Sequence, residues 1–339
     1  MKAVNIKAHP RDSVIMIGER LDNAEKYIPV DKPVIITDTN VQSHWGRHFP
    51  PGDVIAIGSG EKSKTLDTVH DIYEQLLELE ADRSCFIVGI GGGIVCDVAG
   101  FVASTYMRGV RFGFVSTTLL SQVDASVGGK NGFNLGGYKN IIGVFSQPEF
   151  VICDMDLLKT VPPEEILSGF AEIIKHGAIA DKDLFDYLEE NRDRALALDS
   201  TVIEKLVYES VIIKSEIVNQ DEKEKGERRK LNFGHTFGHA IEKTTGVRHG
   251  EAVSAGMVLA SKLAVKKKSL AAASAERLAD LLDNYGLPVL LDFDRSAVLD
   301  TLRMDKKREG QRIHFVLLSE LGRAYVEEIA ISELEELIS

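Results

Sequence analysis

Short apolar runs rich in β-branched residues alternate with segments of helical period from the N-terminus to residue 155. The runs are VIITDT at 34–39, DVIAIG at 53–58, CFIVGIG at 85–91 and FGFVST at 112–117. The segment 65–80 between them spaces its apolar residues as an amphipathic helix does. Strands that alternate with helices are typical of βαβ units, so the pattern predicts a Rossmann-like lobe on a mostly parallel sheet.

The pattern changes near residue 162, where Pro162 and Pro163 mark the start of a helix. Long amphipathic helices follow, and only the segment 312–329 is typical of a β-hairpin, with a glycine in its turn. A chain of 339 residues also exceeds the usual length of one domain. We therefore expect an α/β protein of two domains, a parallel-sheet lobe at 1–161 and a mostly helical lobe at 162–339.

The composition argues against several classes of protein. The formal net charge of −12 opposes binding to nucleic acids or anionic membranes, because a negative surface repels polyanions. No apolar stretch reaches the roughly 18 residues of a membrane span, and the N-terminus has no export signal. The cysteines Cys85, Cys96 and Cys153 lie far apart in apolar runs, which is typical of reduced core residues. We expect a cytoplasmic protein without nucleic-acid or membrane partners.

A glycine-rich turn follows one of the predicted strands. Gly91, Gly92 and Gly93 stand between the run CFIVGIG and a helical segment in which Asp97 comes one turn later. Glycines let the backbone approach phosphate oxygens, and the free N–H groups of a helix start bind anions. The common dinucleotide fingerprint has a third glycine where this chain has Ile94, so a tight turn without a ligand stays open as an alternative.

Three of the nine histidines lie within NFGHTFGHAIEKTTGVRHGE at 232–251. His235 and His239 are four residues apart and share one face of a helix, and Asn232, three residues before His235, is expected to join them. His249 opens the next helical segment after a short connection, which lets it return to that face. Three imidazoles this close favour a shared ligand over unrelated packed or capping side chains.

The segment SGFAEIIKHGAI adds a carboxylate to this set. Glu172 and Lys175 are three residues apart on a helix that is otherwise apolar enough to be buried. A buried carboxylate needs a partner. One carboxylate and two histidines with an open position form a common catalytic zinc site. The spacing does not decide whether His235 pairs with His239 or with His249.

Four long motifs occur in one order along the chain: VGIGGGIVCDVAGF, STTLLSQVDASVGGKNGFNLGGYKN, SGFAEIIKHG, and LNFGHTFGHAIE with HGEAVSAGM. Together they resemble the 3-dehydroquinate synthase family, and the likeness extends from about residue 30 to residue 318. Sugar phosphate cyclases and iron-type alcohol dehydrogenases share the two-lobed fold of this family, so the fold alone would not identify the reaction.

The resemblance implies the residues of the site. Glu172, His235 and His249 would bind zinc or cobalt. The implied NAD site consists of Asp38, Gly60, Glu61, Lys64, Gly91, Gly92, Gly93, Asp97, Thr117, Thr118, Asp124, Lys130, Lys139, Lys159 and Thr160. The implied substrate site consists of Asp124, Lys130, Lys139, Asn140, Lys175, Lys214, Arg228, Asn232, His239 and one of Lys306 and Lys307, for which we take Lys307. Arg108 resembles an arginine that reaches the phosphate pocket of a neighbouring subunit, which implies a homodimer.

The resemblance also implies a reaction. The family converts 3-deoxy-D-arabino-heptulosonate 7-phosphate, a sugar phosphate, to 3-dehydroquinate and phosphate in the shikimate pathway of aromatic amino acid biosynthesis. The implied steps are a transient oxidation by NAD, phosphate elimination, reduction and an intramolecular aldol closure. The many lysines and arginines of the implied site supply the local positive charge that an acidic protein needs for such an anion.

Several alternatives stay open at this point. The nearest is another sugar phosphate cyclase, followed by a metal-dependent polyol dehydrogenase and by a catalytically silent NAD-binding regulator. Two positions depart from the usual pattern of the family: Asn131 stands where the family usually has threonine, and Cys96 where it usually has glycine. Neither departure removes a charged group.

Overall fold

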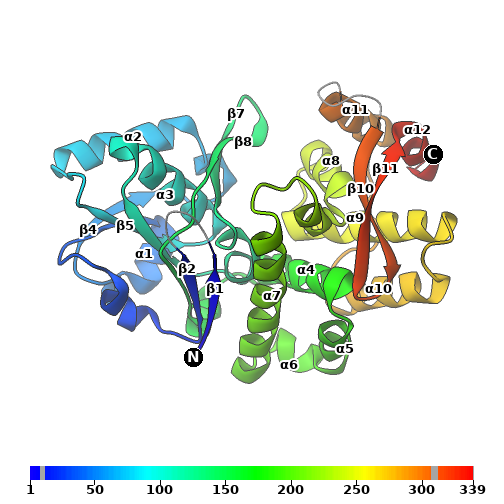
Figure 1. Cartoon of the computed structure of the whole chain (residues 1–339), viewed down its shortest axis with the longest axis horizontal. Helices are drawn as coiled ribbons and strands as arrows, with labels where there is room; N and C mark the ends of the chain where they lie inside the picture. The colour runs from blue at the N-terminus through cyan, green and yellow to red at the C-terminus, as the bar shows by residue number, and fades with distance from the viewer. Residues whose placement is uncertain (8–11, 307–311, 339) are drawn as a thin grey trace. The chain divides into compact units, whose positions relative to one another are not determined.

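The computed structural model describes residues 1–7, 12–306 and 312–338. The chain divides into two compact units, Met1–Pro162 and Pro163–Ser339 (Figure 1). This division lies next to the predicted boundary after residue 161. Among the described residues, no helix combines the length and the apolar character that crossing a membrane requires.

A seven-stranded sheet forms the centre of the first unit. In spatial order its strands are β1 (Lys2–Ile6), β2 (Ser13–Ile17), β9 (Phe150–Cys153), β6 (Arg111–Ser116), β5 (Phe86–Gly91), β3 (Val34–Asp38) and β4 (Asp53–Ile57). β1 and β2 pair antiparallel, and the other neighbours pair parallel. β5 is buried along its whole length, as expected for an inner parallel strand that is covered on both faces. The predicted mostly parallel sheet is confirmed.

Helices and short helical turns connect these strands. The α-helices are α1 (Thr39–Trp45), α2 (Leu66–Glu78) and α3 (Gly93–Thr105), and the shorter turns are η1 (Leu21–Tyr27), η2 (Gly46–His48), η3 (Glu61–Ser63), η4 (Tyr106–Arg108), the π-helical η5 (Ser121–Ala125) and η6 (Met155–Thr160). α2 buries Val69, Ile72 and Leu76, which lie three and four residues apart. This confirms the amphipathic helix that the sequence predicts at 65–80.

The core of the first unit joins strand residues to side chains of η1 and η6. Phe86 and Val88 of β5 pack there with Leu21 of η1 and Leu157 of η6. Two of the three cysteines, on α3 and β9, are buried as predicted, whereas Cys85 is only half-buried. The core prediction is therefore wrong for Cys85, because this residue precedes β5 where the chain comes in from the surface.

A separate antiparallel pair, β7 (Lys130–Leu135) and β8 (Tyr138–Phe145), lies outside the main sheet (Figure 1). The sequence pattern did not predict this hairpin. Gly136 and Gly137 form its turn with φ angles of 59° and 79°. Two-residue hairpin loops of this left-handed kind favour a Gly-Gly pair, so the signal was present in the sequence.

Helices dominate the second unit, as predicted. They are α4 (Pro163–Ala180), α5 (Lys182–Glu190), α6 (Arg192–Leu196), α7 (Ser200–Gln220), α8 (His235–Thr245), α9 (His249–Lys266), α10 (Ala272–Asn284), α11 (Arg295–Lys306) and α12 (Ile331–Ile338), with the 3₁₀ helix η7 (Glu227–Asn232) before α8. The predicted hairpin is formed by β10 (Arg312–Glu320) and β11 (Arg323–Ala330).

α9 is the central helix of the second unit. It packs against α4, α8, α10 and β10, and most of its residues are buried. Because α9 is packed against neighbours on most of its faces, its first residue, His249, is held in a defined position.

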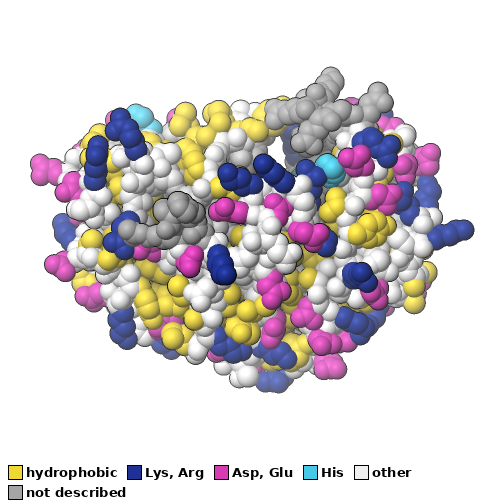
Figure 2. All heavy atoms as spheres, in the orientation of Figure 1, with side chains coloured by type: hydrophobic (Ala, Val, Ile, Leu, Met, Phe, Trp, Pro, Cys, Tyr) yellow, Lys and Arg dark blue, Asp and Glu magenta, His cyan; other side chains and the backbone are white. Residues whose placement is uncertain are grey.

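On the face of the molecule that Figure 2 shows, Lys and Arg side chains are interspersed with Asp and Glu side chains, so the charged surface is mixed.

Candidate functional site

Two helix starts carry two of the predicted histidines. α8 begins at His235, directly after Gly234, whose φ of 80° is a left-handed conformation that glycine adopts without strain. α9 begins at His249, and the backbone N–H of the preceding Arg248 donates to Glu251 Oε2 at 3.0 Å. Both histidines therefore lie in the first turn of a helix whose start is fixed locally.

Glycines allow the helices of the site to approach one another closely. A Cβ atom on Gly256 of α9 would lie 2.0 Å from the backbone oxygen of Gly234. A Cβ atom on Gly250 of α9 would lie 2.4 Å from the Cα atom of Ser168 on α4. Close-packed interiors do not accommodate such contacts without movement of the backbone. The glycines of the motifs thus set the spacing of α4, α8 and α9.

Glu172, His235 and His249 form a compact cluster. Glu172 is fully buried on α4, and its Oε1 lies 3.2 Å from His249 Nε2 and 3.5 Å from His235 Nε2. The three residues each offer one ligand atom within 4.8 Å of the others. One carboxylate oxygen and two imidazole nitrogens in this arrangement fit a divalent metal such as zinc. Of the two pairings that the spacing left open, the geometry favours His235 with His249.

Neighbouring charges determine the protonation of this cluster. Burial by itself raises the pKa of Glu172, but Lys175, His235 and His249 outweigh burial and hold that pKa well below its usual value. Burial and the charge of Lys175 lower the pKa of His235 well below its usual value. Burial also acts to lower the pKa of His249, but Glu172 and Glu242 raise it to about 10. Glu172 is therefore ionised, the form in which a carboxylate binds a metal.

Three of the predicted cationic residues are buried in the second unit. Lys175 on α4, Lys214 on α7 and Arg228 on η7 expose 1%, 6% and 2% of their surface. Lys175 Nζ donates to Glu172 Oε2, and Arg228 Nη1 donates to the backbone oxygen of Glu222 at 2.6 Å. η7 packs against both α4 and α7. A concentration of buried positive charge on neighbouring elements favours an anionic ligand.

Asn232 does not share the helical face of His235, contrary to the prediction. Asn232 ends η7, and two residues separate it from α8. The left-handed φ of Gly234 breaks the helical spacing on which the prediction depended. The Asn232 side chain donates to the carboxylate of Glu224 instead. His239 does lie on α8 after His235; it is exposed, and the two ring centroids are 5.1 Å apart.

In the first unit, the glycine turn joins β5 to α3. β5 ends at Gly91 and α3 begins at Gly93, and no side chain caps the helix start at Gly92. A Cβ atom on Gly91 would lie 2.5 Å from Val95, and one on Gly93 would lie 2.9 Å from Ala125. The predicted strand, turn and helix are thus confirmed. Uncapped N–H groups at the start of a helix are the usual binding groups for phosphate.

Lys64, Asp97 and Asn140 come together from three separate segments. Lys64 is buried, and its Nζ donates to Asp97 Oδ2 and, at 2.5 Å, to Asn140 Oδ1. Burial raises the pKa of Asp97, and the charge of Lys64 opposes this effect. Asn140 has a left-handed φ of 51°, and its N–H donates to Asn134 Oδ1 at 2.9 Å. Left-handed asparagines held by their surroundings are common at ligand sites.

Glu61 and Lys139 border this group of residues. Glu61 Oε1 accepts a hydrogen bond from Asn134 Nδ2 at 2.8 Å and lies 3.8 Å from Lys139 Nζ. Gly60, with a φ of 84°, precedes Glu61, and the backbone N–H of Asn134 donates to the backbone oxygen of Lys64 at 2.9 Å. The segment GEKSK is therefore attached to the β7–β8 hairpin.

Three other predicted cofactor residues have local partners. Asp38 Oδ1 accepts two backbone N–H groups at the start of α1, at 2.9 and 3.0 Å, so this residue is the N-cap of that helix. Lys159 Nζ donates to Asp156 Oδ1 at 2.6 Å and is exposed. Thr160 Oγ1 accepts from the indole nitrogen of Trp45 at 2.9 Å, which links η6 to α1.

The remaining predicted residues of the first unit occupy turns and strand ends: Arg108 in η4, Thr117 and Thr118 after β6, Asp124 in η5 and Lys130 at the start of β7. The Thr117 N–H donates to the backbone oxygen of Gly91 at 2.9 Å, which places this threonine beside the glycine turn. Arg108 is exposed and has a φ of 70°. Lys307, the last predicted substrate residue, lies outside the described residues.

Models of one family match most of the chain. A model described as 3-dehydroquinate synthase N-terminal matches residues 54–168, and one described as 3-dehydroquinate synthase C-terminal matches residues 169–308. The chain belongs to the 3-dehydroquinate synthase family. The 3-dehydroquinate synthase of Pyrococcus furiosus is 43% identical over 308 residues, which cover 88% of this chain and 89% of that protein. The resemblance that the four motifs indicate is confirmed.

Two solved structures share the fold of this family member closely. A 2-deoxy-scyllo-inosose synthase complexed with carbaglucose-6-phosphate, NAD⁺ and Co²⁺ has a TM-score of 0.90 and 27% identity, with 99% of each chain covered. The 2-epi-5-epi-valiolone synthase of Streptomyces hygroscopicus subsp. jinggangensis 5008, with NAD⁺ and Zn²⁺ bound, has a TM-score of 0.90 and 25% identity, with 100% of this chain and 98% of that chain covered. These likenesses confirm the predicted fold class.

Two residues near the predicted sites of the 3-dehydroquinate synthase family were not predicted. Glu242 lies on α8 with its Oε2 3.6 Å from His249 Nδ1. Its position seven residues after His235, two helical turns along one face, was an available signal. Asn134, which contacts Glu61 and Asn140, lies on the hairpin that the pattern did not predict. The Gly-Gly pair at 136–137 was the signal that would have predicted the hairpin and the position of Asn134 on it.

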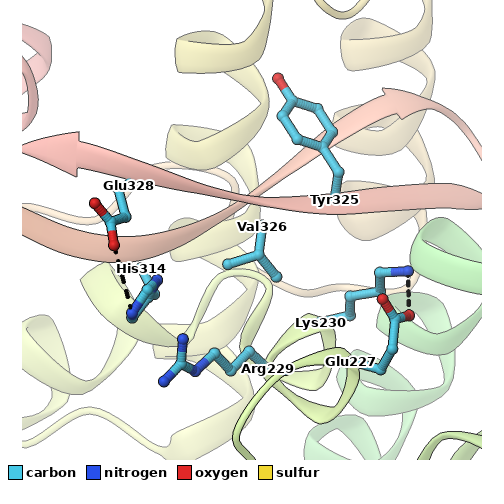
Figure 3. Close-up of a pocket in the computed structure, with 8 residues that line it drawn as sticks. Glu227, Arg229, Lys230, His314, Tyr325, Val326 and Glu328 are labelled. Carbon is cyan, nitrogen blue, oxygen red and sulfur yellow. Dashed lines mark hydrogen bonds and ion pairs between the residues drawn. The ribbon is translucent and has the colours of Figure 1, made fainter.

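A separate hollow of about 520 Å³ lies against η7 and the β10–β11 hairpin (Figure 3). Its lining consists of Gly226, Glu227, Arg229, Lys230, His314, Tyr325, Val326 and Glu328. Lys230 Nζ lies 2.5 Å from Glu227 Oε2, and His314 Nε2 lies 3.9 Å from Glu328 Oε1 (Figure 3). Two of the basic side chains that line this hollow, Lys230 and His314, have acidic neighbours within the hollow itself.

Proposed function

We propose that this chain catalyses the 3-dehydroquinate synthase reaction, in which 3-deoxy-D-arabino-heptulosonate 7-phosphate yields 3-dehydroquinate and inorganic phosphate. The observation that carries the proposal is the buried cluster of Glu172, His235 and His249 beside Lys175, in a chain that belongs to this family. The reaction belongs to the shikimate pathway of aromatic amino acid biosynthesis. We further propose that the enzyme works in the cytoplasm as a homodimer.

The two units would hold the two cofactors. Glu172 Oε1 and the Nε2 atoms of His235 and His249 would bind zinc or cobalt and leave a position open for the substrate. The start of α3 and the group around Lys64 would bind NAD, with the diphosphate at the uncapped N–H groups. When bound, the metal acidifies a substrate hydroxyl and NAD accepts and later returns a hydride. The metal and NAD named for the two solved neighbours support the same pair here.

The buried cations would bind the charged groups of the substrate. Lys175, Lys214 and Arg228 supply positive charge in a region from which water is largely excluded. Negative charge grows on the phosphate as its bond to carbon breaks, and fixed cations stabilise that charge best where the dielectric constant is low. The departing phosphate would itself take the proton from the carbon next to the transient ketone. Lys175 has a second effect, because it keeps Glu172 ionised.

The more exposed predicted residues would complete the substrate site. His239 is the one of the three histidines that would not bind the metal. It would form a hydrogen bond to a substrate hydroxyl or transfer a proton. Asp124, Lys130, Lys139, Asn140, Asn232 and Lys307 are assigned to the substrate by their match to the motifs of the family. Arg108, exposed in a left-handed turn, would reach the phosphate of a second copy.

Another sugar phosphate cyclase is the second candidate function. The two solved structures with TM-scores of 0.90 carry the names of such enzymes, which favours this class of reaction. Their identities of 27% and 25% are well below the 43% shared with the 3-dehydroquinate synthase of Pyrococcus furiosus. A polyol dehydrogenase would have no need for a group of buried cations around a phosphate.

Phosphate release tests the proposal. The zinc-loaded protein, with NAD⁺ at a small fraction of the substrate concentration, is mixed with the heptulosonate 7-phosphate while NADH absorbance is recorded. We expect phosphate to exceed the added NAD⁺ many times, without lasting NADH. No phosphate from protein that binds both zinc and NAD⁺ would contradict the assignment. Phosphate from another sugar phosphate alone would identify the second candidate, and lasting NADH from a polyol would identify a dehydrogenase.

A further inference from the structure

We propose that Glu242 is a positioning residue that fixes the ring orientation and the tautomer of His249 for metal binding. The inference rests on the metal centre of the proposed function. Glu242 lies on α8 and exposes only 9% of its surface. Its Oε2 is 3.6 Å from His249 Nδ1, on the opposite side of the ring from Glu172, which contacts Nε2 at 3.2 Å.

The proton of a metal-binding imidazole explains why such a carboxylate matters. A histidine that binds a metal through Nε2 carries its proton on Nδ1, and that N–H needs an acceptor when it is shielded from water. An acceptor at Nδ1 holds the ring in one orientation and makes Nε2 a better donor to the metal. The 3.6 Å between Glu242 Oε2 and His249 Nδ1 exceeds the usual length of a hydrogen bond, so the proposal requires these two atoms to move closer when the metal binds.

His235 shows the same arrangement with a different acceptor. Its Nε2 lies 3.5 Å from Glu172 Oε1, and its Nδ1 lies 3.2 Å from the backbone oxygen of Phe233. Both histidines therefore turn Nε2 toward Glu172 and Nδ1 toward an oxygen. The acceptor of His235 belongs to the backbone and cannot be removed by substitution, whereas the acceptor of His249 is a side chain.

The same geometry also allows Glu242 to bind a cation directly, and the experiment must distinguish this role from positioning. His239, Glu242 and His249 each offer one ligand atom within 4.8 Å of the others. In that arrangement Glu242 would itself bind a second cation instead of orienting His249. The number of zinc ions per chain distinguishes the two roles.

Zinc affinity of three variants tests the proposal. Glu242→Ala removes the acceptor, Glu242→Gln keeps an oxygen without the charge, and Glu276→Ala, which removes an exposed carboxylate on α10, is the control. Affinity is measured by competition with a chromogenic chelator, without substrate or NAD. We expect Glu242→Ala to bind zinc about 10- to 100-fold more weakly than the wild type, Glu242→Gln to lose less, and Glu276→Ala to keep its affinity.

Further measurements separate positioning from loss of structure. The melting temperature of each metal-free variant reports its folding, and the visible absorption of the cobalt-loaded protein reports the geometry at the metal. A shifted cobalt spectrum and weak zinc binding in a Glu242→Ala protein that melts as the metal-free wild type does would support positioning. If Glu242→Ala binds zinc as tightly as the wild type, the proposal is wrong.

Stoichiometry supplies the remaining outcomes. Two zinc ions per wild-type chain that fall to one in Glu242→Ala would overturn positioning in favour of direct binding by Glu242. Failure of the proposed function is recognised separately, because a folded wild-type protein that binds no zinc would remove the metal centre itself. One zinc ion per chain in both proteins, with the weaker affinity in the variant, is the expected result.

Discussion

The carboxylate–histidine cluster and the glycine turn offer a ligand different kinds of atoms. In the cluster, side chains would bind the metal, and Glu172 already lies 3.2 and 3.5 Å from two histidines. In the turn, backbone N–H groups at the start of α3 would bind the ligand, while Lys64 and Asp97 contact each other. A side-chain substitution should therefore abolish binding in the cluster, whereas in the turn region it should mainly change stability.

The largest effect is expected from Glu172→Gln. An amide oxygen binds zinc poorly, and Lys175 would lose its buried ionic partner. We expect zinc affinity and kcat each to fall by more than about 100-fold, beyond the loss that an outer partner of a metal ligand causes. Zinc content after dialysis and the rate of phosphate release measure the two quantities.

Glu165→Gln is the matched control for this change. Glu165 lies on the same helix, α4, but is exposed at its start. The substitution is chemically identical, so it should leave zinc content and kcat unchanged. Equal zinc content in Glu172→Gln and Glu165→Gln would show that the cluster of Glu172, His235 and His249 does not bind the zinc. The contrast between a side-chain site and a backbone site would then be wrong.

The next largest effect concerns the stability of the first unit. Lys64→Met leaves the partly buried carboxylate of Asp97 without its partner, so the free energy of unfolding should fall by about 3 kcal/mol. Zinc content should not change, because the cluster belongs to the second unit. Denaturant unfolding measures the loss, with Lys62→Met, an exposed lysine of the same turn, as the control. A Lys64→Met protein as stable as the control would mean that this ion pair contributes nothing to folding.

A smaller effect is expected where backbone spacing, and not a ligand, is changed in the cluster. Gly256→Ala places a Cβ atom where the backbone oxygen of Gly234 lies, so α8 and α9 must separate. We expect a loss of about 1–3 kcal/mol in the free energy of unfolding and a weaker zinc affinity, because His235 moves relative to His249. Chelator competition and denaturant unfolding measure both.

Gly246→Ala provides the control for the glycine effect. Gly246 ends α8 with a φ of 74°, and nothing lies within 4 Å of its added Cβ atom. The substitution should cost about 1 kcal/mol through backbone strain alone and leave zinc affinity unchanged. Unchanged zinc affinity in both glycine variants would show that the spacing of α8 and α9 does not set the metal geometry.

The sequence predicted the cluster in part, for identifiable reasons. Helical period and residue type brought Glu172 and the three histidines together as candidates, because spacing along a helix determines which side chains share a face. The resemblance to the family then implied His235 and His249 as the two ligands. The choice between His239 and His249 depended on the turn between two helices, which no local pattern describes. The prediction for Asn232 was wrong because it assumed a continuous helix from Asn232 to His235. The left-handed φ of Gly234 interrupts that helix.

In the first unit, local features were predicted and contacts between distant segments were not. The strand, the glycines and the helix start were predicted, because turn chemistry is local. The partners of Lys64 were not, since Asp97 and Asn140 reach it from distant segments, one of them in a hairpin that was missed. Contacts between segments depend on the packing of the whole sheet, so residue type alone indicates them only through likeness to a family.

The smallest predicted effect concerns the departure from the family pattern at Asn131. Its Nδ2 donates to the backbone oxygens of Gly129 at 3.0 Å and Ser146 at 2.8 Å, and its side chain fills the space beside Gly100 on α3. The side chain thus holds the two strands of the β7–β8 hairpin together at their open end. Asn131→Thr keeps at most one of the two hydrogen bonds, so the free energy of unfolding should fall by about 1 kcal/mol.

Asn134→Thr is the comparison that sharpens this prediction. Asn134 lies on the same strand but contacts Glu61 and Asn140 of the proposed cofactor and substrate sites. We expect its replacement to raise the KM for NAD⁺ several-fold, because two site residues lose their common partner, whereas Asn131→Thr should leave that KM unchanged. A raised KM for NAD⁺ in Asn131→Thr would show that the open end of the hairpin also affects the proposed cofactor site. Hydrogen bonds from a side chain to the backbone would then matter for NAD⁺ binding as much as contacts between side chains.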